Sequence, residues 1–137
     1  EPWRADSSME KKAFKVLVIE DDPNYFILVN ERLSQNANPT FELIRSKHMQ
    51  SGLERLGDGD IDVVLLDLML PDSEGLSSFL SVHKAFPTVP IIILTAVDDD
   101  DLASQAISWG AQDYLTKGSF DRELLVKCIC YAISRNK

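Results

Sequence analysis

The chain has 137 residues and a net charge of −8, from 22 acidic and 14 basic side chains. This length suits a single domain, and the acidic balance argues against non-specific binding to nucleic acid or to a membrane surface, because both favour basic proteins. Apolar residues make up 45% of the chain, which suffices for a hydrophobic core without disulfides or a structural metal.

The N-terminal segment is polar and lacks hydrophobic periodicity. We interpret residues 1–13 as a disordered tail or as sequence added to the natural protein, and residues 14–137 as the folded domain. The segment does not resemble a signal peptide, and no apolar run approaches the length of a membrane span, so we expect a cytoplasmic protein. Cys128 and Cys130 lie two positions apart in a helical pattern and point to different sides, so we expect both to be packing residues.

The first strand is predicted at residues 15–19, whose apolar run at 16–19 stops at three consecutive acids, Glu20, Asp21 and Asp22. Asp22 is a candidate N-cap for a helix that begins at Pro23, since proline is favoured at the first helical position. The helix is predicted to extend to about residue 35. Its expected apolar side consists of Phe26, Ile27, Val29 and Leu33.

The second strand, at residues 41–44, is interrupted by a polar residue and therefore suits a sheet edge. A short helix follows at residues 50–56. The third strand is an unbroken Val/Leu run that ends at Asp67, and Pro71 and Gly75 then turn the chain away. A helix is predicted at residues 73–86, with a buried side formed by Leu76, Phe79, Leu80 and Val82.

The fourth strand, within residues 89–95, is again continuously apolar and ends at Thr95. Acids at 98–101 are expected to cap the next helix, which ends before Gly110. A short fifth strand at 113–116 leads to Lys117 and Gly118. Ser119 is expected to cap the last helix, whose apolar stripe is Leu124, Leu125, Cys128, Ile129, Ala132 and Ile133.

Five alternations of strand and helix predict an α/β fold with a parallel sheet and helices on both faces. The continuously apolar first, third and fourth strands belong in the centre, and the broken or short second and fifth strands belong at the edges. With right-handed crossovers, this favours a doubly wound, flavodoxin-like five-stranded sheet of order 2-1-3-4-5.

Polar groups collect where these strands end. The central strands end at Glu20 with Asp21, at Asp67 and at Thr95, and the fifth strand ends just before Lys117. Three carboxylates and one ammonium leave a charge of −2, which a divalent cation such as Mg²⁺ would offset. We expect Lys117 to be free for a further anion. A carboxylate nucleophile, a metal and a lysine suit phosphoryl transfer onto Asp67.

The chain from residue 15 to residue 135 resembles the receiver domain of two-component response regulators. The resemblance is carried by four motifs: Val-Ile-Glu-Asp-Asp at 18–22, Leu-Leu-Asp-Leu-Met-Leu-Pro-Asp-Ser-Glu-Gly at 65–75, Ile-Leu-Thr-Ala at 93–96, and Asp-Tyr-Leu-Thr-Lys at 113–117.

The resemblance implies that Asp67 accepts a phosphoryl group from a phosphohistidine on a histidine kinase or phosphotransfer protein. It also implies that Asp21, Asp67 and the carbonyl of Met69 ligate Mg²⁺, with Glu20 acting through water.

The resemblance further implies that Lys117 holds a phosphoryl oxygen and that Thr95 and Tyr114 act as the switch. The surface of the fourth helix, fifth strand and fifth helix would then change its preference for an output partner or a second copy. For Tyr114, we give equal weight to this switch role and to that of an ordinary aromatic residue in an edge strand.

The sequence departs from the family at Gly118, where the family's lysine is usually followed by a cis proline. A cis peptide without proline is costly, so we expect Gly118 to adopt an unusual φ and ψ instead. Two positions that tune phosphoryl lifetime in the family fall on Met69 and Val97. Both are apolar, which predicts slow autodephosphorylation.

Three other protein classes share part of this pattern. A haloacid-dehalogenase-like phosphatase needs a second acid two residues after its aspartate, where Met69 stands. An FMN carrier needs a glycine- and hydroxyl-rich phosphate loop, where the acids at 20–22 would repel phosphate. A receiver-like interaction module that is not phosphorylated stays open, since Gly118 favours it and the intact acid, threonine and lysine set opposes it.

Overall fold

The computed structural model describes residues 13–35, 39–70, 72–95, 100–118 and 120–135. The expectations for the N-terminal tail, for Val97 and for the capping acids at 98 and 99 lie outside these ranges. The elements in chain order are β1 (Ala13–Ile19), α1 (Pro23–Ser34), β2 (Thr40–Ser46), α2 (Met49–Gly57), β3 (Val63–Asp67), β4 (Met69–Leu70), β5 (Ser73–Glu74), α3 (Leu76–Ala85), β6 (Ile91–Thr95), α4 (Asp100–Ser108), β7 (Asp113–Thr116) and α5 (Arg122–Arg135).

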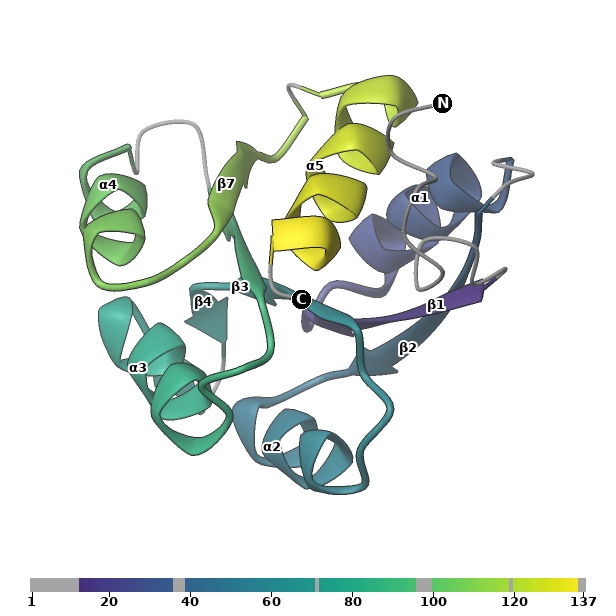
Figure 1. The fold of residues 1–137 in the computed structure, drawn as a ribbon. Coiled ribbons are helices and arrows are strands. Elements are labelled where there is room, and N and C mark those ends of the chain that lie inside the picture. Colours follow the sequence, from purple (N-terminus) through teal and green to yellow (C-terminus); the bar gives the residue numbers. More distant parts are fainter. Residues whose placement is uncertain (1–12, 36–38, 71, 96–99, 119, 136–137) are drawn as a thin grey trace.

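The main sheet has five parallel strands in the order β2-β1-β3-β6-β7, which confirms the predicted order. Of the three strands predicted to be continuously apolar, β3 and β6 are buried at every position, and β1 is buried from Val16 to Ile19. Figure 1 shows α1 and α5 together on one side of the sheet and α2, α3 and α4 on the other. None of the described helices has the length and apolar character needed to cross a bilayer.

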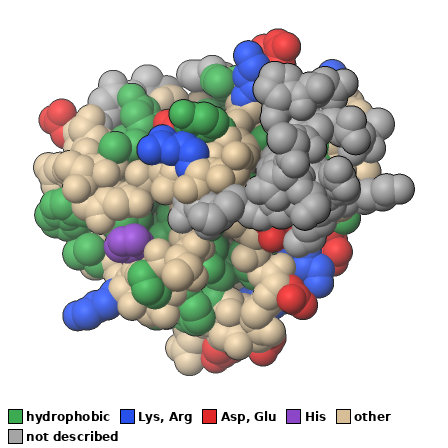
Figure 2. Space-filling model, in the orientation of Figure 1, with side chains coloured by type: hydrophobic (Ala, Val, Ile, Leu, Met, Phe, Trp, Pro, Cys, Tyr) green, Lys and Arg blue, Asp and Glu red, His purple; other side chains and the backbone are tan. Residues whose placement is uncertain are grey.

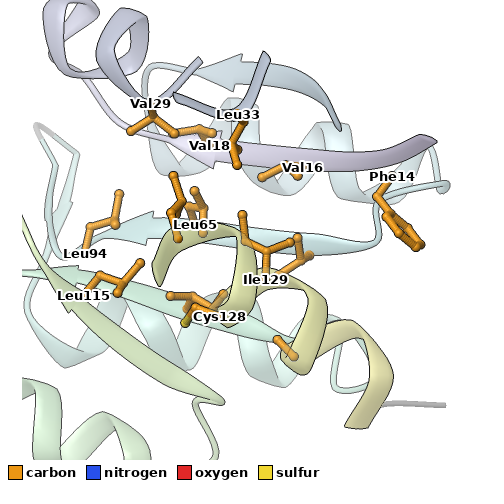
Figure 3. Packing of buried hydrophobic residues seen from close by; sticks show 14 of the residues in the cluster. Phe14, Val16, Val18, Val29, Leu33, Leu65, Leu94, Leu115, Cys128 and Ile129 are labelled. Carbon is orange, nitrogen blue, oxygen red and sulfur yellow. The ribbon is translucent and has the colours of Figure 1, made fainter. Parts of the chain in front are cut away.

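Each face of the sheet carries its own hydrophobic cluster. On the α1 and α5 side, Val18 and Leu65 of the sheet pack with Val29 and Leu33 of α1 and with Ile129 of α5 (Figure 3). On the other side, alternate strand residues pack against α2, α3 and α4. This alternation follows from the two-residue period of a strand, so both faces of the same apolar run are used.

The helix starts depend on local capping. The Asp22 carboxylate accepts a hydrogen bond from the Asn24 amide at 2.9 Å, and Pro23 opens the helix, as predicted. The last helix differs from the prediction, because α5 begins at Arg122 and its cap is Asp121, whose carboxylate accepts from the Leu124 amide at 2.9 Å. Ser119 itself is outside the described residues.

The predicted helix at 73–86 begins too early. Residues 73–74 form β5, which pairs antiparallel with β4, and α3 begins only at Leu76. The physical reason lies at Gly75, whose φ of 65° and ψ of −152° are not helical. The Gly75 amide donates to the Leu68 carbonyl at 2.7 Å and closes this small hairpin directly after Asp67.

Three predicted core residues are wrong. Ile27, Leu80 and Leu124 are 53%, 41% and 47% exposed. Each stands one or two positions from a residue that does face the sheet, and one or two steps of 100° turn a side chain off the buried stripe. In Figure 2, hydrophobic side chains reach the surface on the side where α3 and α4 lie in Figure 1.

The C-terminus of α4 ends in the predicted glycine cap. The Ala111 amide donates to the Ala106 carbonyl at 2.9 Å and the Gly110 amide donates to the Ile107 carbonyl at 3.1 Å, which is the Schellman pattern. Gly110 has a φ of +125°, and a Cβ atom there would lie 2.8 Å from His83 Nε2.

Both cysteines are free thiols. Cys128 is buried in the α5 stripe, and its thiol donates to Asp113 Oδ2 at 3.5 Å. Burial, with the nearby Asp113 charge, raises the pKa of Cys128 to about 12, and burial also raises the pKa of Cys130. High thiol pKa values disfavour the reactive thiolate, in agreement with a packing role.

Candidate functional site

Parallel pairing brings the polar strand ends to one edge of the sheet. Ile19 of β1 pairs with Leu66 of β3, so Glu20 and Asp67 emerge side by side. Thr95 of β6 pairs with Thr116 of β7, so Lys117 follows directly beyond it. The Lys117 amide donates to the Thr95 carbonyl at 2.8 Å and extends this pairing past the strand ends.

Three carboxylates form a compact cluster at this edge. One carboxylate oxygen each from Glu20, Asp21 and Asp67 lies within 4.8 Å of the others. Glu20 and Asp67 are buried, with exposures of 0% and 6%, whereas Asp21 is exposed. Like charges this close are costly when desolvated, so the cluster is a candidate site for a hard cation with oxygen ligands.

The Lys117 ammonium lies between two of these acids. Its Nζ is 2.7 Å from Glu20 Oε1 and 3.2 Å from Asp67 Oδ2. The sequence reading expected a lysine free for another anion, but in this structure both carboxylates hold it. The strong local negative charge explains this, since it attracts the nearest ammonium. Burial would lower the pKa of Lys117, but hydrogen bonding to Glu20 and the charges of Asp67 and Glu20 outweigh it, so the pKa is raised.

Glu20 is the most perturbed acid of the cluster. Its pKa is raised to about 7, mainly by burial and also by the Asp67 charge, while Lys117 and the hydrogen bond from the Asp22 amide oppose the shift. Its Oε2 accepts from the Asp22 amide at 3.1 Å. Its buried Oε1 has no hydrogen bond of good geometry among the described residues, so the contact with Lys117 is an ion pair. An oxygen in this state retains capacity for a further positive partner.

The Asp67 carboxylate is fixed by its own loop. Asp67 Oδ1 accepts from the Met69 amide at 3.0 Å, while Oδ2 faces Lys117. The same loop is tied to α2, because Asp72 accepts from the amides of Met49 and Gln50 at 2.9 and 3.2 Å. Met69 is 52% exposed, which leaves this part of the loop accessible from solvent.

Thr95 and Tyr114 are near the edge, but no contact between described residues links their side chains to the acid cluster. The Thr95 hydroxyl is buried and donates to the Leu115 carbonyl at a long 3.5 Å. Tyr114 is half-buried and packs against the hydrophobic cluster on the α2, α3 and α4 side. Gly118 has a φ of +81°, as predicted for a residue that replaces proline here.

Sequence reasoning missed two residues at this edge. Arg45 of β2 donates to the backbone carbonyls of Glu20 and Asp21, at 3.1 and 2.8 Å. The Tyr25 ring of α1 lies 4.6 Å from Lys117 Nζ, and its buried hydroxyl has no hydrogen-bond partner among the described residues. Arg45 could have been noted as the polar residue beside the end of the first strand. Tyr25 had no comparable signal in the sequence.

Comparisons with known proteins agree with this geometry. The family model described as the response regulator receiver domain matches residues 16–129. The Glycerol metabolism activator of Pseudomonas putida is 30% identical over 107 residues, which cover 77% of this chain and 48% of that protein. The transcriptional regulatory protein MalR of Bacillus subtilis is 34% identical over 102 residues, covering 74% and 43%. The chain therefore spans about half the length of these curated relatives or less.

Solved structures of receiver-domain proteins also match this chain. A response regulator receiver domain protein from Clostridium thermocellum matches with a TM-score of 0.79 and 29% identity, covering 89% of this chain and 95% of that one. Full-length FixJ from B. japonicum matches with a TM-score of 0.80 and 26% identity, covering 90% and 59%. On the combined evidence of strand order, clustered acids and matched sequence, the chain belongs to the family of response regulator receiver domains.

Proposed function

We propose that Asp67 accepts a phosphoryl group from a phosphohistidine, carried by a histidine kinase or a phosphotransfer protein. Receiver domains of this family are signalling domains that partner with such proteins. The observation that carries the proposal is the arrangement of Lys117 Nζ at 3.2 Å from Asp67 Oδ2, beside three carboxylates within 4.8 Å. The nucleophile Asp67, the Lys117 ammonium and the carboxylate cluster that can attract a cation therefore lie around a single site.

In the transfer, an Asp67 oxygen forms a bond to phosphorus while the bond from phosphorus to the imidazole nitrogen breaks. The imidazole leaves with the electron pair. The Met69 amide holds Oδ1 by a hydrogen bond, so rotation of the carboxylate is restricted. Lys117 is placed to pair with a negatively charged oxygen of the incoming phosphoryl group. To do so, it exchanges its contacts with Glu20 and Asp67 for that oxygen.

The acids fit Mg²⁺ as the cation. The donor set is oxygen only, its summed charge with Lys117 is negative, and the buried Glu20 Oε1 has capacity for another partner. Asp21, Asp67 and the Met69 carbonyl would hold the ion, with Glu20 acting through water. When bound, the ion would neutralise charge on the transferred phosphoryl group.

The response is proposed to pass through Thr95 and Tyr114 to the surface of α4, β7 and α5. Within the described part of the chain, the Thr95 hydroxyl makes only a long bond at 3.5 Å, which it can exchange for a phosphoryl oxygen at little cost. Tyr114 lies half-buried on the adjacent strand and can change its packing in turn. Such a change would shift the population of two surface states and select an output partner or a second copy, with no direct role in nucleic-acid binding.

The role is signalling rather than metabolic turnover, with slow loss of the phosphoryl group. The apolar, exposed side chain of Met69 offers no group to orient a hydrolytic water at Asp67. A half-life of the phosphorylated protein of seconds would contradict this part of the proposal.

The test is the intact mass of the protein after incubation with a small phosphodonor, with and without Mg²⁺. We expect a Mg²⁺-dependent phosphoryl adduct in the natural sequence and none in Asp67→Asn. Asp72→Asn is the matched control, because Asp72 lies in the same loop but bonds to α2, so its adduct should persist. A folded protein that binds Mg²⁺ but forms no adduct would favour an interaction module that is not phosphorylated.

A further inference from the structure

Arg45 occupies an unexpected position for a cation beside an acidic cluster. It belongs to the edge strand β2 and pairs in register with Val18 of β1, two residues before Glu20. Arg45 is half-buried, and its guanidinium reaches the residues just after β1. No ion pair joins it to a carboxylate among the described residues, although its guanidinium contacts the backbone of two acids of the cluster, Glu20 and Asp21, just after β1.

The guanidinium instead binds two consecutive backbone carbonyls. Nε donates to the Glu20 carbonyl at 3.1 Å, and Nη2 donates to the Asp21 carbonyl at 2.8 Å. The planar guanidinium presents its N–H donors as a rigid fork, so it can hold two acceptors at once in fixed directions. A lysine ammonium has much less directional control. The Glu20 amide is held on the same strand, since it donates to the Ser46 carbonyl at 3.0 Å.

These contacts fix the backbone from which the acids project. With the Glu20 amide and both carbonyls bonded to β2, the peptide planes at 20 and 21 have a set orientation. The side chains of Glu20 and Asp21 therefore start from a fixed backbone and meet Asp67 within 4.8 Å. Because the fork is bonded to carbonyl oxygens, it leaves the carboxylate oxygens available.

We propose that Arg45 is a positioning residue, which orients the Glu20–Asp21 backbone so that its carboxylates form a cation site with Asp67. This inference rests on the proposed Mg²⁺-dependent function. Groups that orient metal ligands from outside the ligand set affect metal affinity by about 10- to 100-fold when they are removed.

The direction in which Mg²⁺ affinity changes distinguishes positioning by Arg45 from a simple charge effect. If Arg45 acted only through its positive charge, its removal would tighten the binding of a cation. If its fork positions the acids, removal weakens binding. Arg45→Met removes fork and charge, whereas Arg45→Lys keeps the charge and loses the fork. Positioning predicts weaker Mg²⁺ binding in both variants.

The experiment is isothermal titration calorimetry with Mg²⁺, paired with the rate of adduct formation as a function of Mg²⁺ concentration. We expect the Kd to rise about tenfold in Arg45→Met and less in Arg45→Lys. The Mg²⁺ concentration for half-maximal rate should rise equally, while the rate at saturating Mg²⁺ stays unchanged. A purely structural role would not produce this split between affinity and maximal rate.

Arg55→Met is the matched control. Arg55 also donates to a backbone carbonyl, that of Gly59 at 2.9 Å, but it lies at the far end of α2, so its Mg²⁺ affinity should equal that of the natural sequence. An unchanged or tighter affinity in Arg45→Met would overturn the proposal, and Arg45→Lys carries the same test if the methionine variant does not fold. Natural protein that binds no Mg²⁺ would instead overturn the proposed function itself, together with this role of Arg45.

Discussion

The two ends of the parallel strands differ in how their polar groups are bonded. We call the side where the strands begin the amino edge and the side where they end the carboxyl edge. At the amino edge, Lys15 and Asp62 satisfy one another: the Lys15 amide donates to Asp62 Oδ2 at 2.8 Å, and the Asp62 amide donates to the Lys15 carbonyl at 2.9 Å. At the carboxyl edge, buried acids crowd together, and Glu20 has a pKa raised to about 7. The amino edge therefore contributes stability, whereas the carboxyl edge holds unrelieved charge that a ligand can use.

The largest expected effect tests the amino edge, where Gly110 lies shortly before the start of β7. Gly110→Ala places a Cβ on a residue with a φ of +125°, at 2.8 Å from His83 Nε2, so we expect a loss of about 1–3 kcal/mol in the free energy of unfolding. Urea unfolding at neutral pH measures it. Mg²⁺ affinity should not change, because the site is at the opposite edge.

Gly57→Ala serves as its control. Gly57 ends α2 without a positive φ, and a Cβ there would contact nothing within 4 Å. We expect no loss of stability and a gain of up to about 1 kcal/mol. Equal losses in both glycine variants would show that the amino edge has no special conformational requirement at Gly110.

A smaller effect, of the opposite sign, tests the carboxyl edge. The Tyr25 hydroxyl is buried without a partner among the described residues, so Tyr25→Phe should raise the free energy of unfolding by about 1 kcal/mol. The ring remains, and with it the contact to Lys117. Thermal unfolding in the absence of Mg²⁺ is the measurement. Tyr131→Phe, at a 62% exposed position, should change nothing, and a destabilised Tyr25→Phe would contradict the contrast between the edges.

The smallest effect concerns pH and the loop after Asp67. Hydrogen bonds from the amides of Met49 and Gln50 lower the pKa of Asp72 below its ordinary value. A lowered pKa of a carboxyl group gives stability that is present above its unfolded value, near 4, and is lost as pH falls through the folded pKa. The stability difference between the natural sequence and Asp72→Asn should therefore be small at pH 7 and shrink further in acid. A difference that grew below pH 4 would contradict this.

Much of the fold could be predicted because its signals are local or additive. Continuous apolar runs at 16–19, 63–66 and 91–94 suit burial between two layers of helices, and the broken second strand suits a sheet edge. Together with right-handed crossovers, these patterns favour the strand order that the structure has. The cap at Asp22 was equally readable, since it involves residues two apart.

The errors occurred where small rotations or short hairpins decide the outcome. Whether Ile27 or Val29 faces the sheet depends on how α1 is turned, and both are apolar. Residues 73–74 pair with residues 69–70 instead of starting the helix because Gly75 leaves the helical region, which a glycine permits but does not require. The apolar pattern alone does not distinguish these cases.

The sequence by itself determined the strand order and the residue types that meet at the carboxyl edge, because parallel strands with apolar centres must all end on the same side. Only the tertiary structure decided how those groups are held. Lys117 pairs with two acids, Arg45 reaches the carbonyls of Glu20 and Asp21 from the neighbouring strand, and Asp72 ties the loop to α2. These contacts join residues from 22 to 97 positions apart in the chain (Met49 to Asp72 is 23, Gln50 to Asp72 is 22, Glu20 to Lys117 is 97), so local patterns carry no trace of them.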